Sequence, residues 1–252
     1  LLTKDADIVC YLFLRKYYKH ELTNKRINMN DKELVADAAL DYVKNNSIVG
    51  LGTGSTADIF INALAKKISA ESLNIKVVAS STSTHEKANA AGLNYISIDQ
   101  ITELDLYIDG ADEITENLDI LKGRGYDLVR EKILARASKS FIVIGDQSKI
   151  VSKIGEKYSI PIEITPIAWK ITKILVEKLA IKCEVRENLT KNAFAITSYG
   201  NYVLDCEFNE TNLKRLGDEI ASIPGVFEHG LFIDMCGLAL IASNGQITKI
   251  TT

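Results

Sequence analysis

The sequence predicts an α/β protein in which a mainly parallel sheet is accompanied by a smaller α+β region. Short apolar segments alternate with amphipathic helical segments from Met29 to about residue 150, and such alternation is typical of right-handed βαβ units. Residues 159–226 differ, because strands of alternating polarity follow one another and a Gly-Asn pair marks a hairpin turn. The second pattern indicates a small antiparallel sheet with helices on one side.

The elements of the first region follow from the spacing of apolar residues. The stretch 31–45 begins after Asn30 or Asp31 as a cap and has Glu33 in its first turn, which is a helix start signal. The stretch 56–70 repeats apolar residues along one helical face, from Ile59 to Ile68. The expected helices are 31–45, 56–70, 84–91 and 127–138. The expected strands are 47–51, 75–80, 94–98, 104–108 and 140–145.

The second region contains a strand that prolines bracket, followed by a helix and three alternating strands. The expected strands are 160–166, 183–187, 194–199 and 202–208, and the expected helices are 167–180 and 212–223. Residues after 226 return to short strands and turns, which are expected to complete the first region. The expected domains are therefore 29–158 with 227–252, and 159–226, after an extension at residues 1–28.

Composition narrows the function classes. The 252 residues are 46% hydrophobic and 25% charged, and the formal net charge is -3. Because there is no basic excess, bulk electrostatic binding to nucleic acid or to an anionic membrane surface is not expected. The apolar run at 8–14 is too short to span a bilayer. The acidic residues Asp5 and Asp7 precede it, which is unlike a signal peptide. Met29 is therefore the expected functional start.

Cysteines and histidines give no metal signal. Cys10, Cys183, Cys206 and Cys236 are far apart and form no Cys-x-x-Cys pair, so neither a zinc site nor a dithiol redox motif is expected. Scattered thiols of this kind predict reduced cysteines in a cytoplasmic protein. The three histidines stand alone in the sequence, and we expect them to be structural or solvated.

A glycine-rich loop, GLGTGSTAD at 50–58, joins an expected strand to an expected helix. Gly52 and Gly54 allow close backbone approach, and Ser55 or Thr56 could cap the helix, so the loop suits a phosphate. It lacks the lysine of a Walker loop and the third glycine of a dinucleotide fingerprint, and the next strand ends in the hydroxyls of 80–84. A small phosphorylated molecule fits better than NAD or ATP, and a capped turn without a ligand is the alternative.

The segment DLYIDGADE at 105–113 carries an apolar strand directly onto Asp109, Asp112 and Glu113. In open α/β sheets, ligands bind at the carboxyl ends of the strands, which is where these acids fall. A turn of solvated acids is the alternative. The spacing D-x-D-x-D-G of a calcium loop is absent.

Lys122 precedes a second glycine-containing loop, and the helix that follows carries Glu131. Leu128, Glu131 and Ala135 fall on adjacent turns, so Glu131 could be partly desolvated, with a raised pKa suited to a base. From these residues alone, a surface glutamate in the charged run 130–132 is the favoured reading. Combined with a phosphate loop and acidic, hydroxyl-rich segments, however, a Glu base and a Lys beside an oxyanion fit aldose–ketose isomerisation through an enediolate.

Eight segments together resemble the ribose-5-phosphate isomerase family, type A: IVGLGTGSTAD, VVASSTST, DLYIDGADEI, LKGRG…REKI, GDQSKIV, IPIEITP, YGNYVLDC and IPGVFEHGLF. The resemblance implies a Rossmann-like sheet domain with a smaller α+β lid domain. It implies a homodimer or homotetramer that works without metal or cofactor. The implied reaction interconverts D-ribose 5-phosphate and D-ribulose 5-phosphate in the non-oxidative pentose phosphate pathway.

The resemblance also implies roles for individual residues. Glu131 matches the base that transfers the proton, and Lys122 matches the lysine that stabilises the enediolate. Asp109 and Asp112 match the pair that handles ring opening and the sugar hydroxyls. The implied substrate-binding residues are Thr53, Gly54, Ser55, Thr56, Gly110, Ala111, Gly123, Arg124, Gly125 and Lys149.

The chain departs from the family after Lys122, where a run of glycines and small residues is usual. Arg124 and Tyr126 put bulk where the backbone is expected to approach the substrate. Asp127 lies four residues before Glu131 and is expected to raise the pKa of that carboxyl further. The alternative function is accordingly a catalytically impaired sugar-phosphate-binding protein of the same fold.

Overall fold

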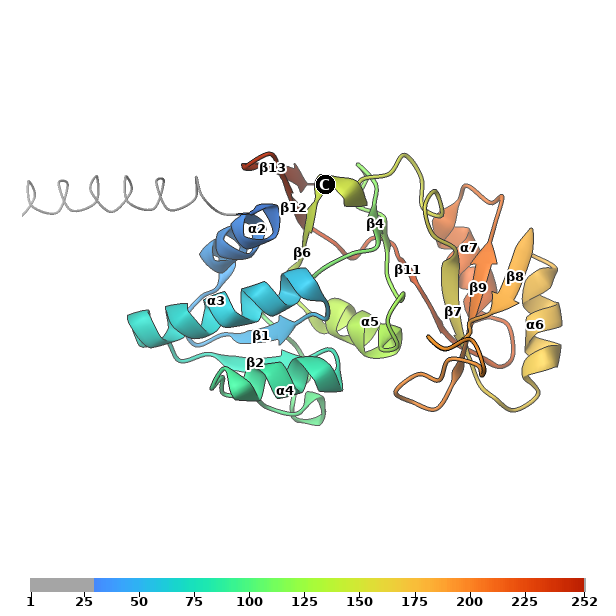
Figure 1. Cartoon of the computed structure of the whole chain (residues 1–252), viewed down its shortest axis with the longest axis horizontal. Coiled ribbons are helices and arrows are strands. Elements are labelled where there is room, and N and C mark those ends of the chain that lie inside the picture. Colours follow the sequence, from blue (N-terminus) through green and yellow to red (C-terminus); the bar gives the residue numbers. More distant parts are fainter. Residues whose placement is uncertain (1–29, 252) are drawn as a thin grey trace, which may run out of the picture.

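The computed structural model describes residues 30–251 (Figure 1). The expected extension at 1–28 and the expected start at Met29 lie outside this range. The Asn30 side chain accepts a hydrogen bond from the Glu33 amide at 3.0 Å, and the Glu33 side chain reaches back to the Asn30 amide at 3.1 Å. This capping box confirms the predicted start of α2 (Asp31–Ala39). The helix is shorter than predicted, because a 3-10 turn at Leu40–Tyr42 follows it.

A six-stranded sheet forms the larger part of the described chain. Its strands in spatial order are β13 (Gln246–Thr251), β12 (Leu238–Ser243), β6 (Phe141–Asp146), β3 (Leu106–Asp109), β1 (Ile48–Leu51) and β2 (Lys76–Ala79). The pairings from β2 across to β12 are parallel, and β13 pairs antiparallel with β12 at the edge. The mainly parallel sheet that the sequence predicted is confirmed.

Alternate residues of these strands face two apolar layers. Val49 and Ile108 pack with α2, α3 (Ser55–Glu71) and α4 (Thr82–Ala90) on one face. Tyr107 and Val143 pack on the other face with α5 (Leu128–Ala137) and a small three-stranded sheet. That sheet has the order β11 (Leu231–Phe232), β5 (Ile120–Leu121) and β4 (Glu113–Ile114). With both faces covered, the parallel strands read as continuous apolar runs.

A second unit, which we call the four-stranded unit, lies beside the first along the long axis of the molecule, with α5 between the two sheets (Figure 1). Its strands in spatial order are β10 (Val226–His229), β7 (Ile160–Ile164), β9 (Tyr202–Glu207) and β8 (Lys182–Val185), all antiparallel. One face packs under α6 (Trp169–Glu177) and α7 (Leu213–Ala221). The antiparallel sheet with helices on one side is thus as predicted.

Three expectations about local structure are wrong. Residues 94–98 form only a single bridge from Tyr95 to Val77 before a 3-10 turn at Ile98–Gln100. Residues 194–199 form no strand, although the predicted turn is present, since the Thr197 amide donates to the Asn201 carbonyl at 2.9 Å and Gly200 has a φ of +78°. The boundary expected between 226 and 227 falls inside β10, which pairs with β7.

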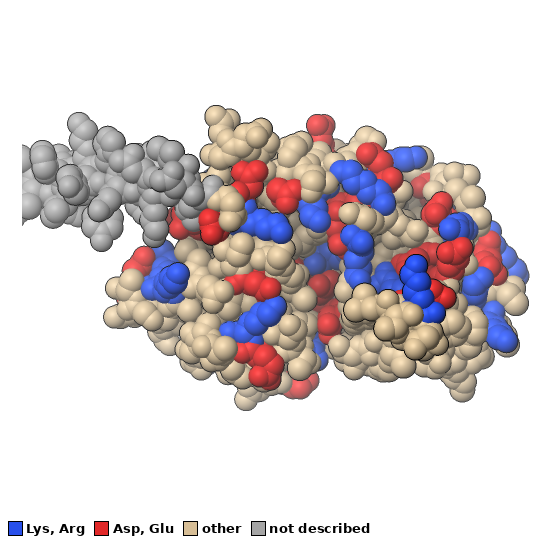
Figure 2. Space-filling model, in the orientation of Figure 1, with Lys and Arg blue, Asp and Glu red and all other residues tan. Residues whose placement is uncertain are grey.

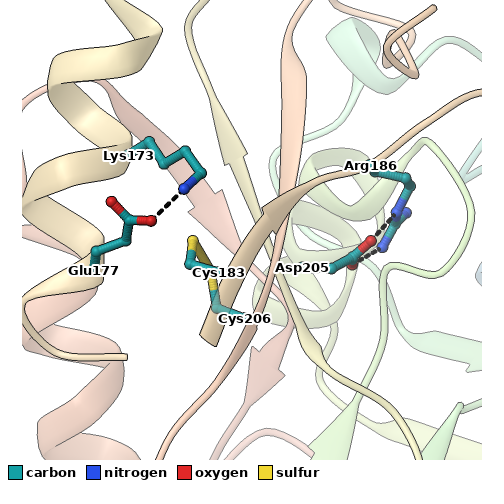
Figure 3. The surroundings of a disulfide bond; sticks show 6 residues. All are labelled: Lys173, Glu177, Cys183, Arg186, Asp205 and Cys206. Atoms are coloured by element: carbon teal, nitrogen blue, oxygen red, sulfur yellow. Dashed lines mark hydrogen bonds and ion pairs between the residues drawn. A yellow bond between two sulfur atoms is a disulfide. The ribbon is translucent and has the colours of Figure 1, made fainter. Parts of the chain in front are cut away.

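The cysteines also differ from expectation. Cys183 on β8 and Cys206 on β9 lie opposite each other in the strand register and are joined by a disulfide (Figure 3). Their Cα atoms are 4.2 Å apart although 23 residues separate them in the sequence, so the pairing follows from the strand register and not from a sequence motif. Cys236 is free and buried. The expectation of reduced, scattered thiols is therefore wrong for this pair.

Candidate active site

A cavity of about 450 Å³ lies at the carboxyl edge of β1, β3 and β6. Every predicted site residue except Asp109 lines its wall, and Asp109 lies directly behind Lys122. The wall residues that the sequence did not predict are Lys32, Ala57, Ile144, Gly145, Asp146 and Ser148. The structure thus brings together segments from residue 32 to residue 149 at the sheet edge where parallel α/β folds place ligands.

The glycine-rich loop leaves the first turn of α3 without a side-chain cap. Gly54 is the N-cap residue, with a φ of +124°, and no side chain accepts a hydrogen bond there, so the expected cap by Ser55 or Thr56 is wrong. The free amides of a helix start favour an anion. Lys32 reaches this loop from α2 and donates to Ser55 Oγ at 2.8 Å. The cavity therefore has a positive, hydrogen-bond-donating end.

The hydroxyl-rich segment at 80–84 does not reach the cavity. Ser80, Ser81 and Thr84 are buried, and their hydroxyl groups lie 2.8 to 3.0 Å from Thr53 Oγ1. Thr84 Oγ1 also donates to the Gly52 carbonyl at 3.0 Å. These three hydroxyls hold the glycine-rich loop in place, so the expectation that the hydroxyl-rich segment serves the isomerisation substrate is wrong.

Asp109 is a fully buried carboxylate at the end of β3. The Thr53 amide donates to its Oδ1 at 3.0 Å, and the Tyr107 hydroxyl donates to its Oδ2. A Cβ atom at Gly52 would lie 2.1 Å from Asp109 Oδ1, so only glycine allows the loop to approach. Burial and the negative charge of Asp109 raise the pKa of Tyr107 well above its ordinary value, which keeps the hydroxyl as a donor.

Lys122 is the positive charge that the acidic cluster requires. Its buried ammonium lies 2.8 Å from Asp109 Oδ2 and 3.4 Å from Glu131 Oε2, and it donates to the Gly110 carbonyl at 3.0 Å. Burial acts to lower the pKa of Lys122, but the charges of Asp109 and Glu131 outweigh it and raise that pKa above the ordinary value. Lys122 therefore stays protonated between two carboxylates.

Glu131 is a buried carboxyl at the cavity wall, so the surface reading of this residue is wrong. Burial raises the pKa of Glu131 to about 8; Lys122 works against that shift, while Asp109 and Asp112 add to it. The predicted upward shift of the Glu131 pKa is confirmed, but Asp127 is not among its causes. The Asp127 carboxylate instead accepts a hydrogen bond at Oδ1 from Ser198 Oγ at 2.6 Å. A carboxyl with such a pKa suits general-base catalysis near neutral pH.

The other acids of DLYIDGADE have separate positions. Asp112 lies on the cavity wall, and its Oδ2 accepts the Arg124 amide at 3.1 Å. Glu113 is fully buried and accepts the amides of Gly155, Lys157 and Tyr158 at 2.6, 2.6 and 2.8 Å. Glu113 is therefore a structural anchor that points away from the cavity wall.

Tyr126 lies outside the cavity, whereas Arg124 lines its wall. The Arg124 guanidinium lies over the Tyr158 ring, 3.8 Å from its centroid, and Tyr126 does not line the cavity. Stacking of this kind stabilises an arginine at an exposed position. The expectation that a bulky side chain crowds the backbone approach is therefore wrong for Tyr126, while Arg124 lines the wall with its guanidinium over the Tyr158 ring.

Lys149 lies just beyond β6 and lines the same end of the cavity as Lys32. Burial opposes ionisation of the neighbouring Asp146, but hydrogen bonds from Ser148 and the charges of Lys149 and Lys32 hold the pKa of Asp146 below its ordinary value. No sequence motif indicates Lys32, which lies 18 residues before the start of the glycine-rich loop. Two cations at one end and a Lys–Glu pair at the other divide the cavity into an anion end and a proton-transfer end.

A second cavity, of about 620 Å³, lies between α5 and α7. It contains none of the predicted site residues. Lys132 lies on its wall, where burial lowers the pKa of the ammonium to about 8. That ammonium donates to Glu228 Oε1 at 2.6 Å and to the His229 carbonyl at 2.5 Å, so its hydrogen bonds are structural.

Comparison with known proteins identifies the family. Residues 76–246 match the family model described as ribose 5-phosphate isomerase A (phosphoriboisomerase A). The chain is 40% identical to ribose-5-phosphate isomerase A 1 of Oceanobacillus iheyensis over 217 residues, which covers 86% of this chain and 96% of the relative. It is 42% identical to ribose-5-phosphate isomerase A of Agrobacterium fabrum over 212 residues, covering 82% and 91%.

Solved structures agree with these sequence relatives. Ribose 5-phosphate isomerase A from Methanocaldococcus jannaschii superposes with a TM-score of 0.83 at 33% identity, covering 88% of this chain and 98% of that one. A D-ribose-5-phosphate isomerase in complex with phospho-erythronic acid gives a TM-score of 0.85 at 32% identity, covering 89% and 100%. This chain belongs to the ribose-5-phosphate isomerase A family.

Proposed function

We propose that the cavity at the carboxyl edge of β1, β3 and β6 is the active site of this isomerase, where D-ribose 5-phosphate and D-ribulose 5-phosphate are interconverted through an enediolate. The observation that carries the assignment is the Lys122 ammonium, held between the buried carboxylates of Asp109 and Glu131 at the cavity wall. The substitutions of Glu131 and Lys122 described in the Discussion test it. A solved relative holds phospho-erythronic acid, a phosphorylated sugar acid, and such a molecule matches a cavity with an anion end.

The proton-transfer end supplies each group that the reaction needs. In the open-chain aldose, the Glu131 carboxylate removes the proton from carbon 2, and the electron pair forms the carbon 1–carbon 2 double bond. The oxygen on carbon 1 gains negative charge, which the Lys122 ammonium stabilises. Glu131 returns its proton to carbon 1, and the hydroxyl proton on oxygen 2 passes to oxygen 1. No metal or cofactor is assigned a part.

The two aspartates take different parts in this proposal. Asp112 presents its carboxylate on the cavity wall, where it can bind sugar hydroxyls and assist ring opening. Asp109 is fully buried and already holds Lys122 and Tyr107, so we assign it the positioning of the lysine and not direct contact with the sugar. The resemblance implied that both aspartates handle ring opening and the sugar hydroxyls, and we assign that role to Asp112 alone.

The phosphate is assigned to the opposite end of the cavity. The uncapped amides of α3, together with Lys32 and Lys149, supply donors and positive charge there. Lys32→Met and Lys149→Met are each expected to raise KM for ribose 5-phosphate about tenfold while kcat stays within about twofold, because a remote phosphate contact stabilises ground state and transition state alike. Steady-state kinetics measure both constants.

Lys87→Met is the matched control, because Lys87 is an exposed lysine on α4 that pairs with Asp58 at 2.7 Å, outside the cavity. Its KM should equal that of the wild type. Unchanged KM in both cavity variants would place the phosphate elsewhere.

Self-association is the second part of the proposal, as a homodimer or homotetramer. Exposed apolar side chains concentrate on the four-stranded unit, where Ile167, Ile171 and Ile174 are 78%, 63% and 59% exposed around α6. Burying such a surface against a second copy of the chain is favourable. Sedimentation velocity should give a mass of two or four chains, and a single-chain mass at micromolar concentration would contradict the proposal.

The remaining assignments concern domains, partners and location. We place the division between the two proposed domains after His229, because β10 pairs within the four-stranded unit. Acidic and basic side chains are interspersed over the face shown in Figure 2, which supports the absence of a nucleic-acid partner. No described helix is long and apolar enough to cross a membrane. We also propose a cytoplasmic location, because the relatives are metabolic enzymes. The cysteines do not support this location, since Cys183 and Cys206 are joined by a disulfide. Cell fractionation tests it.

A further inference from the structure

Three consecutive carbonyl groups of the loop after Lys122 converge on one side chain of the four-stranded unit. Arg186 Nη1 donates to the carbonyls of Gly123, Arg124 and Gly125 at 2.9, 3.3 and 3.0 Å. Oxygens that converge in this way repel one another unless a cation or donor lies between them. The Arg186 guanidinium therefore offsets the electrostatic cost of the loop conformation.

The guanidinium is itself held on its other edge. Arg186 Nε donates to Asp205 Oδ2 at 2.9 Å, and Nη2 donates to Asp205 Oδ1 at 2.5 Å, a bidentate pair across the β8–β9 edge (Figure 3). The Arg186 side chain is only 13% exposed. A bidentate pair fixes the plane of the guanidinium, which leaves Nη1 directed at the loop.

The same unit also holds the far end of the loop. The Ser198 amide donates to the Tyr126 carbonyl at 3.3 Å, and Ser198 Oγ donates to Asp127 Oδ1 at 2.6 Å. Asp127 is the N-cap residue of α5, the helix that carries Glu131. The loop from Gly123 to Asp127 is thus held from the four-stranded unit at both ends.

Lys122 and Glu131 flank this loop, and their side chains meet at 3.4 Å. The loop conformation also allows the Arg124 amide to donate to Asp112 Oδ2 on the cavity wall. Gly123 permits the conformation with a φ of +100°, where a side chain would clash with Pro161 and Leu128. Any shift of the loop would therefore move the lysine and the helix start with respect to each other.

We propose that Arg186 is a positioning residue for the isomerase reaction, which holds the Gly123–Gly125 loop so that Lys122 and Glu131 keep their catalytic geometry. The inference rests on the assignment of this cavity as the active site. Arg186 does not line the cavity, so it acts through the loop and not on the sugar.

The test is Arg186→Met, with Arg186→Lys as the conservative variant and Arg215→Met as the control. Arg215 is an exposed arginine on α7 that also pairs with a carboxylate, Glu219, at 2.9 Å. Arg186→Met is expected to lower kcat about 30- to 100-fold, because small misplacements of reacting groups cost about this much. Arg186→Lys keeps the positive charge but loses the planar guanidinium that bonds Asp205 and the loop at once, so kcat is expected to fall about tenfold. The control should match the wild type.

The pH profile separates positioning from a merely structural role. Lys122 holds down the pKa of Glu131, so a loosened Lys122–Glu131 contact should move the rising limb of kcat/KM to higher pH. The Arg186→Met midpoint should shift upward by about half a unit or more. Wild-type kcat and midpoint in Arg186→Met overturn the inference, and if that variant does not fold, wild-type values in Arg186→Lys overturn it.

Failure of the active-site assignment itself would look different. In that case Glu131→Gln would keep its activity whatever Arg186 does. Loss of activity in Glu131→Gln together with unaltered Arg186 variants would overturn the positioning role alone.

Discussion

Glu131→Gln should lower kcat by about three orders of magnitude while KM changes little, because a positioned general base contributes about 10²- to 10⁴-fold. The amide keeps the size of the carboxyl but cannot accept the carbon-bound proton. Because the proposed mechanism uses Glu131 as a base, which requires its ionised form, kcat/KM should rise with pH and level off above about 8, the pKa to which burial raises this carboxyl. Initial rates of ribulose 5-phosphate formation across pH measure both effects.

The rising limb centred near that pKa should disappear in Glu131→Gln, since the titrating base is gone. Glu116→Gln is the control, because Glu116 is exposed and lies outside the cavity. Equal rates in Glu131→Gln and the wild type would remove Glu131 from the mechanism and would contradict the active-site assignment.

Lys122→Met should lower kcat by about 10²- to 10³-fold, the usual cost of removing a donor to a developing oxyanion. The same change should destabilise the fold by about 3–5 kcal/mol, because it leaves the buried Asp109 carboxylate without its cation. Denaturant unfolding measures the stability, and steady-state kinetics measure the rate.

Two further variants separate the two effects of Lys122. Lys122→Met combined with Asp109→Asn removes the unpaired charge, so stability should largely return while kcat stays low. Lys139→Met is the matched control, since Lys139 also lies between two carboxylates, Glu103 at 2.8 Å and Asp105 at 3.0 Å, but is 55% exposed. Exposed pairs contribute about 0–1 kcal/mol, so this control should change neither quantity much. Recovery of kcat in the double variant would rule out an oxyanion role.

Much of the fold could be predicted because its signals are local. The apolar runs of the parallel strands and the cap at Asn30 are written in short stretches, and the structure has them where the sequence indicated. The strand predicted at 194–199 is wrong because that prediction also used only a local pattern. Its alternating pattern predicts a strand, but only Phe194 forms a single bridge, to Glu187, and its ring packs edge-on against Trp169 and Tyr202.

The site residues also fall into those that local motifs predict and those that only the folded arrangement brings together. Glycine loops and acids at strand ends predicted most of the cavity wall, because the carboxyl ends of parallel strands meet at one edge. Lys32, Arg186 and the Cys183–Cys206 bond could not be found, because each meets its partner only through the folded arrangement. The hydroxyls at 80–84 were misread, since the sequence does not show that they bond to one another and to Thr53.

The three amides on Glu113 bear on how this enzyme can open. They belong to Gly155, Lys157 and Tyr158, on the connector that leads into β7 and the four-stranded unit. The return connector is also tied down, since the Lys122 amide donates to the Gly230 carbonyl and the Gly230 amide donates to the Pro161 carbonyl. Hydrogen bonds to a charged group contribute about 1.5–3 kcal/mol each, so swinging the unit about these connectors would cost several such bonds. Both connectors are therefore fastened to the core of the molecule, one by a buried carboxylate and the other by backbone hydrogen bonds.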